Sequence, residues 1–152
     1  MDMYITLVGD EYPKAINSLW AVLKQEKFVP DELFLVIEEE KDLIEKLEKD
    51  LKQLLENYDI NTSVEFIVFS EIGDIRQIIE GPQEDEKGKI ALDISSASKL
   101  IMAKVLIDKD YHIFDHVFYL EVDDKDRRNP LPTIEQNKVR LRDLKNEPTE
   151  AV

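Results

Sequence analysis

Hydroxyl and charged side chains cluster at one point in the second half of the chain, between two apolar segments. Asp93 ends the first apolar segment, Ser95, Ser96 and Ser98 follow it, and Lys99 begins the second. The pattern predicts a buried strand, a tight turn and a helix. The first amides of a helix lack intrahelical acceptors and lie at the positive end of the helix dipole. The chemistry expected here is therefore the binding of a phosphate or another anion.

The predicted start of this helix sets the roles expected of its neighbours. Ser95 or Ser96 is expected to cap the helix, which places Lys99 in its first turn. A cation there is unfavourable by roughly a few tenths of a kcal/mol unless an anion is bound nearby. An ordinary cap followed by a solvent-exposed lysine explains the same residues equally well. Asp93 either accepts hydrogen bonds from the turn, which is the simpler role, or helps to bind a ligand.

Length and composition set the broad class of protein. A chain of 152 residues without cysteine fits one domain with its own hydrophobic core, expected over 1–145 and followed by a disordered tail over 146–152. The net charge of −14 argues against binding to long DNA or RNA. No apolar run approaches membrane-spanning length and the first residues do not resemble a signal peptide, so a cytoplasmic protein with no membrane contact is expected.

The remaining apolar segments alternate between strand and helix patterns. Strands are predicted at 3–8, 33–37, 64–69, 90–93 and 115–122, with a short one around 138–141. Helices are predicted at 13–27, 43–58 and 72–79 and after the serine turn to 106, and 81–89 is predicted to be a charged loop. Strands separated by helices predict an α/β fold: a Rossmann-like, doubly wound, mainly parallel sheet of five or six strands with helices on both faces.

The expected topology brings two loops together. In the common strand order 3-2-1-4-5, the first and fourth strands are neighbours at the point where the winding reverses, and ligands bind beyond their carboxyl ends. Gly9, Asp10 and Tyr12 follow the first strand, and residues 94–99 follow the fourth. The sequence therefore predicts that these two loops meet and form one binding site.

Several other chemistries lack the residues they need. The glycine-rich motifs of dinucleotide and nucleoside-triphosphate sites are absent. A phosphoacceptor domain of similar layout needs an aspartate at the end of the third strand, where the chain has Phe69-Ser70-Glu71. His112 and His116 are four residues apart but lack a third ligand, so neither a metal site nor a cofactor is expected.

The serine turn carries a family resemblance. Residues 93–102, Asp-Ile-Ser-Ser-Ala-Ser-Lys-Leu-Ile-Met, resemble the Asp-x-Thr-Gly-Gly-Thr-Lys segment and following apolar residues of the CRISPR-associated Rossmann-fold (CARF) domains. Serines replace both threonines, Lys99 matches the lysine, and Ser96 and Ala97 replace the two glycines. The loop at 7–10 is similar to the family's first loop, and the order of strands and helices covers nearly the whole chain.

The resemblance implies a ligand and an assembly. CARF domains form homodimers whose paired loops bind cyclic oligoadenylate, a small cyclic RNA that is a second messenger of type III CRISPR antiviral immunity. The chain would then be a sensor or sink for this ligand, either as a stand-alone member or as a fragment of a larger effector. The ligand-binding residues implied are Gly9, Asp10, Tyr12, Asp93, Ser95, Ser96, Ala97, Ser98 and Lys99.

Some members, the ring nucleases, cleave the cyclic ligand without metal by holding a ribose 2′-hydroxyl in line with the adjacent phosphate. The resemblance implies Lys99 and Ser98 as the catalytic residues, with Ser96, Ser98 or Tyr12 orienting the hydroxyl. The sequence offers no obvious general base, so any cleavage is expected to be slow. The alternative is a structural or protein-interaction module with no nucleotide ligand, in which the serine turn only caps a helix.

Overall fold

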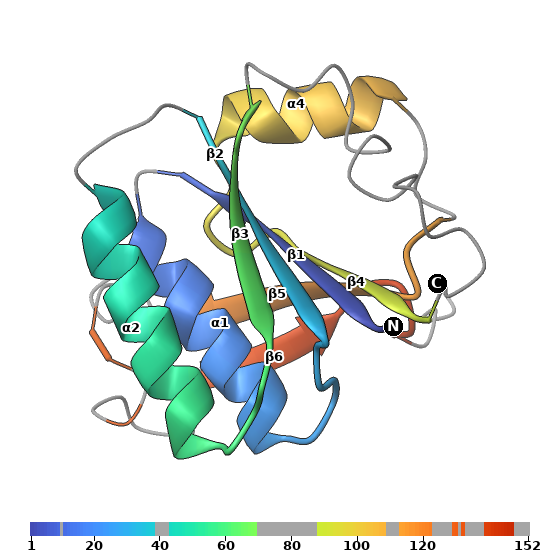
Figure 1. Cartoon of the computed structure of the whole chain (residues 1–152). Helices are drawn as coiled ribbons and strands as arrows, with labels where there is room; N and C mark the ends of the chain where they lie inside the picture. Colours follow the sequence, from blue (N-terminus) through green and yellow to red (C-terminus); the bar gives the residue numbers. More distant parts are fainter. Residues whose placement is uncertain are drawn as a thin grey trace.

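The fold is a six-stranded mixed sheet with helices packed against it (Figure 1). The computed structural model describes residues 1–9, 11–38, 43–69, 88–108, 113–122, 129–130, 132 and 139–147. Its elements are β1 (Met3–Val8), α1 (Tyr12–Lys24), β2 (Glu32–Ile37), α2 (Leu43–Asn57), β3 (Ser63–Val68), β4 (Ile90–Asp93), α4 (Lys99–Asp108), β5 (His116–Val122) and β6 (Val139–Asp143).

The strand order is β3-β2-β1-β4-β5-β6. The first five strands are parallel to their neighbours, and β6 runs antiparallel to β5 at the edge. The α/β class and the predicted order of the five main strands are therefore confirmed. Residue 6 of β1 is level with residue 93 of β4, so the carboxyl ends of these two strands lie side by side.

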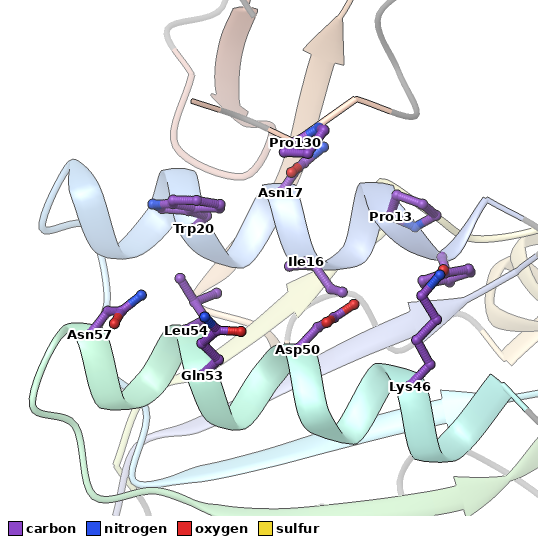
Figure 2. A pocket seen from close by; sticks show the side chains of 11 residues that line it. Pro13, Ile16, Asn17, Trp20, Lys46, Asp50, Gln53, Leu54, Asn57 and Pro130 are labelled. Atoms are coloured by element: carbon purple, nitrogen blue, oxygen red, sulfur yellow. The ribbon is translucent and has the colours of Figure 1, made fainter. Parts of the chain in front are cut away.

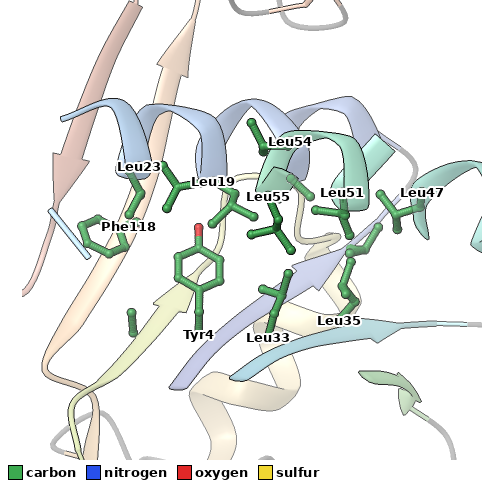
Figure 3. Packing of buried hydrophobic residues seen from close by; sticks show 14 of the residues in the cluster. Tyr4, Leu19, Leu23, Leu33, Leu35, Leu47, Leu51, Leu54, Leu55 and Phe118 are labelled. Atoms are coloured by element: carbon green, nitrogen blue, oxygen red, sulfur yellow. The ribbon is translucent and has the colours of Figure 1, made fainter. Parts of the chain in front are cut away.

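Alternating side chains of β1 enter two separate cores. Tyr4 and Val8 pack with apolar residues of α1 and α2 (Figure 3), whereas Ile5 and Leu7 pack in a second cluster that includes Ile101 of α4. Both sets are buried, as expected for a central strand of a parallel sheet. The alternation places α1 and α2 on one face of the sheet and Ile101 of α4 on the other.

Element ends differ slightly from the sequence prediction. Helix α1 ends at Lys24, about three residues early, because Glu26 adopts a left-handed conformation (φ 53°) and the Lys27 amide donates to the carbonyl of Val22. The first two residues of the predicted tail make contacts with the rest of the chain. The Asn146 side chain hydrogen-bonds the carbonyl of Asp115, and Glu147 pairs with Arg142. The predicted helix at 72–79 and loop residues 81–87 lie outside the described residues, as does the tail from 148 onward.

Of the helices in the described ranges, none combines the length and the hydrophobicity that a bilayer crossing requires.

Candidate ligand-binding site

The loops after β1 and β4 are joined by direct hydrogen bonds. The Gly9 amide donates to the Ser96 carbonyl oxygen at 2.8 Å, with Ser96 Oγ at 3.2 Å from the same nitrogen. The Ser96 hydroxyl in turn donates to the carbonyl of Glu11 at 2.9 Å. Neighbouring parallel strands end at the same edge of the sheet, so two segments about 87 residues apart become one surface. The predicted meeting of these loops is confirmed.

Gly9 is required by this contact. A Cβ at residue 9 would lie 2.5 Å from the Ser96 carbonyl oxygen and 3.0 Å from the Ser98 amide nitrogen, both backbone atoms. No glycine in the described residues has a positive φ, so steric room and not backbone conformation explains the glycine. The first loop can approach the serine turn this closely only without a side chain.

Asp93 lies beneath the serine turn, fully buried between the sheet and α1. Its carboxylate accepts hydrogen bonds from the hydroxyls of Thr6 (2.8 Å), Ser18 (2.8 Å) and Ser95 (2.7 Å), and from the Ser95 amide (3.1 Å). Burial raises the pKa of Asp93 above its usual value, and these four donors partly offset the rise. In this conformation Asp93 orients the turn and does not reach the surface.

Ser95 and Ser96 also stabilise the loop from within. Both are 5% exposed, and the Ser95 oxygen accepts a further hydrogen bond from the Leu120 amide of β5 at 2.8 Å. Their hydroxyls are therefore used by the turn, and the prediction that one of them caps the helix is wrong. Ser98 is the cap: its Oγ accepts from the Ile101 amide at 3.2 Å, and its carbonyl accepts the first helical bond from Met102.

The outward-facing part of the loop consists of Ala97, Ser98 and the first residues of α4. Ala97 and Ser98 are half-buried, while Lys99 and Leu100 are exposed, Leu100 by 61%. The amides of Lys99 and Leu100 occupy the first two helical positions, where no intrahelical acceptor exists. Two helix amides and the Lys99 ammonium group therefore lie at this end of α4, where an anion is favoured.

Glu38, which the sequence pattern did not single out, also belongs to this site. It directly follows β2, the strand next to β1, and its Oε1 accepts a hydrogen bond from the Ser98 hydroxyl. A carboxylate of the chain itself therefore lies beside the helix amides. The predicted strand order could have indicated this contact, because it places the end of β2 near the loops after β1 and β4. An anionic ligand must displace or tolerate this carboxylate.

The other predicted residues divide between two places. Asp10 lies outside the described residues. Tyr12 begins α1 and lines a groove of about 350 Å³ between α1 and α2, where the Lys46 ammonium lies 5.8 Å from the centre of its ring (Figure 2). The structure therefore places Tyr12 in a groove between helices, while the hydroxyls of Ser96 and Ser98 donate to Glu11 and Glu38.

His112 lies outside the described residues, while His116 begins β5 and its Nδ1 is 2.7 Å from the Asp143 carboxylate. Within the described ranges, no group of three or more His, Cys, Asp or Glu residues is arranged to hold a metal ion. The pairing with Asp143 gives His116 a structural partner at the end of the sheet opposite the serine turn.

Comparison of the chain with protein-family models, with curated proteins and with solved structures gave no match in any of the three.

Proposed function

We propose that the chain is a cytoplasmic, Rossmann-like, doubly wound domain of CARF type that binds cyclic oligoadenylate as a homodimer, acting as a sensor or sink. The observation that carries the proposal is the pair of hydrogen bonds from the Gly9 amide to Ser96. This contact joins the two loops beside the start of α4, where the amides of Lys99 and Leu100 face a ligand. The acidic surface of the chain disfavours long nucleic acids but leaves this local anion site in place.

Isothermal titration with cyclic oligoadenylates of three to six units tests binding directly. We expect one ring per dimer, and Lys99→Ala should weaken binding at least about tenfold because it removes the ammonium beside the phosphate. Lys52→Ala is the matched control, since Lys52 is an exposed lysine of α2 that pairs with Glu48 away from the serine turn. Heats near zero for every ring size, or equal losses in the two variants, would contradict the proposal.

The contact between Glu38 and Ser98 favours slow cleavage as a second activity. In this step a ribose 2′-oxygen attacks the adjacent phosphorus while its proton passes to the Glu38 carboxylate. The bond from phosphorus to the 5′-oxygen breaks, that oxygen takes a proton from water, and a linear product with a 2′,3′-cyclic phosphate results. Lys99 and the first amides of α4 would stabilise the charge that develops on phosphorus.

Glu38→Gln separates binding from cleavage. The variant removes a negative charge from the anion site, so cyclic oligoadenylate should bind more tightly by roughly fivefold or more. The same variant should lose cleavage of labelled ligand in metal-free buffer, because the carboxamide does not accept the proton. Unchanged binding would show that Glu38 does not compete with the ligand, and intact ligand with the wild-type chain would exclude the nuclease activity.

The alternative is a structural or protein-interaction module without a nucleotide ligand. It is favoured by the internal hydrogen bonds of Ser95 and Ser96, whose buried hydroxyls already have partners within the chain. In that case Ser96→Ala lowers the free energy of unfolding by about 1 kcal/mol and no cyclic oligoadenylate raises the melting temperature. A thermal-shift screen with the four ring sizes distinguishes this alternative from ligand binding.

A further inference from the structure

The groove between α1 and α2 is lined differently from the serine loop. Ile16 and Leu54 form an apolar floor, and the indole of Trp20 lies along one wall. Figure 2 shows Asp50, Gln53 and Asn57 extending from α2 toward the space beside α1. The cavity volume of about 350 Å³ falls at the lower end of the range for small-molecule sites, roughly 300–1,000 Å³. The groove therefore suits one small ring system and not an extended chain.

One wall of the groove is fixed by a buried amide. Asn17 is 3% exposed, and its side chain donates to the Asn129 carbonyl at 2.7 Å. This hydrogen bond holds the segment containing Pro130 against α1, and Pro130 lines the groove. The groove is thus bounded by three segments of the chain and is preformed in the structure.

The polar groups of the groove indicate the chemical class of the ligand. The amides of Gln53 and Asn57 each offer donors and an acceptor, and the Asp50 carboxylate accepts from an N–H group. Among the described lining residues, the charged side chains are Lys46 and Asp50, one of each sign. A groove with one cation and one anion has no excess positive charge for a polyphosphate. The pattern of amides beside an indole matches an uncharged planar ring with a hydrogen-bonding edge.

We propose that this groove binds an uncharged purine nucleoside, with its base stacked on Trp20 and its polar edge bonded to Asp50 and the Gln53 amide, which lie one turn apart on α2. A bicyclic purine covers more of the indole than a pyrimidine does, and asparagine and glutamine amides match the donor and acceptor pair on the edge of adenine. The proposal goes beyond the cyclic oligoadenylate site, because it needs neither the serine loop nor a second copy of the chain.

Trp20 is the only tryptophan of the chain, so its fluorescence reports on this groove alone. Titration with adenosine, excited at the red edge of indole absorption, should give saturable quenching, while uridine and ribose give much weaker effects. Linear quenching without saturation would overturn the proposal. So would a stronger response to benzylamine than to adenosine, because this would assign the groove to an organic cation.

Two substitutions test the contacts by isothermal titration with adenosine. Asp50→Asn should weaken binding at least about fivefold, whereas Glu56→Gln, the same charge change on α2 outside the groove, should leave it unchanged. Trp20→Ala should weaken binding at least about tenfold, and Trp20→Phe should restore most of it by keeping an aromatic face. Equal effects of Asp50→Asn and Glu56→Gln would contradict the proposal, even if Trp20→Ala failed to fold.

Lys99→Ala distinguishes adenosine binding in the groove from cyclic oligoadenylate binding at the serine turn. The variant should lose cyclic oligoadenylate and keep adenosine binding, whereas Asp50→Asn should do the reverse. Loss of adenosine binding in Lys99→Ala would place adenosine at the serine loop and overturn the assignment to the groove.

Discussion

Asp93 at the carboxyl end of β4 and Asp143 at the opposite end of the sheet both accept several hydrogen bonds, but from different kinds of groups. Asp93 is completely buried and receives its bonds from hydroxyls and one amide. Asp143 is 23% exposed at its side chain and pairs with His116 and Asn146. Burial acts to raise the pKa of both carboxyl groups. For Asp93 the net result is a raised pKa. For Asp143 the hydrogen bonds from His116, Asn146 and the Val117 amide outweigh burial, so its pKa is lowered.

The comparison shows how the depth of burial decides the net direction. Four hydrogen bonds to the fully buried Asp93 do not cancel the cost of burying its carboxylate, whereas the bonds from His116, Asn146 and the Val117 amide more than cancel the cost at the partly exposed Asp143. The carboxyl end of the sheet is thus organised around a buried acid that orders a loop, and the opposite end around an acid and histidine pair that joins β5 to β6. Substitutions at the two ends should therefore differ in their effects on stability.

The largest effect is expected from Asp93→Ala. The substitution leaves the buried donors of Thr6, Ser18 and Ser95 without their acceptor, which should lower the free energy of unfolding by about 3 kcal/mol or more. Asp143→Ala, at a site that water can reach, should lower it by about 1 kcal/mol. Urea denaturation followed by circular dichroism measures both values. Equal losses would mean that the Asp93 network contributes no more than a surface pair.

The next effect is expected from Gly9→Ala. Its Cβ would overlap backbone atoms of the serine turn, so the two loops must separate, at about 2 kcal/mol. Gly88→Ala, near the opposite end, would place a Cβ 2.3 Å from the Asp2 carboxylate and 2.8 Å from backbone atoms of Met1, but Met1 is exposed and can shift, so the loss of stability should be smaller, about 1 kcal/mol. Gly9→Ala should also abolish binding of cyclic oligoadenylate, whereas Gly88→Ala should keep it. Retained binding in Gly9→Ala would separate the ligand site from the contact between the loops.

The smallest effect is a difference in pH dependence. The raised pKa of Asp93 gives a contribution to stability that is complete below its unfolded pKa of about 3.8 and is lost as the pH rises through its folded pKa. The lowered pKa of Asp143 gives a contribution that is present above its unfolded pKa of about 3.8 and is lost as the pH falls through its folded pKa.

Unfolding measured between acidic and neutral pH should therefore respond oppositely to the two asparagine variants. Asp143→Asn should flatten the loss of stability in acid. Asp93→Asn should remove the decline that the wild type shows as Asp93 ionises. The same pH profile in both variants would contradict the opposite pKa directions.

Much of the fold could be predicted from the sequence, because apolar runs of strand length alternate with amphipathic helices. The meeting of Gly9 with Ser96 could also be predicted, since it follows from the neighbouring positions of β1 and β4. The partners of Asp93 could not, because Thr6 and Ser18 are 87 and 75 residues away and reach it only through strand register and the rotation of α1. The sequence indicated these two partners only as a threonine within an apolar strand and a serine on the buried side of a helix.

The choice of helix cap was missed for a related reason. Three serines occur within four positions, and each can cap a helix in isolation. The Asp93 carboxylate accepts from the Ser95 hydroxyl and the Glu11 carbonyl accepts from the Ser96 hydroxyl, which leaves Ser98 to cap the helix. Glu38 was missed because its contact with Ser98 depends on β2 lying next to β1.

The sequence by itself determined the α/β class, because apolar strand segments and amphipathic helices alternate along the chain, and the strand order common to such folds then predicted that the two loops meet. The tertiary structure alone decided which hydroxyls are buried, which serine caps α4 and that Glu38 lies at the anion site. Those outcomes depend on hydrogen bonds between residues far apart in the chain, whose partners are selected only when the sheet and its helices pack together.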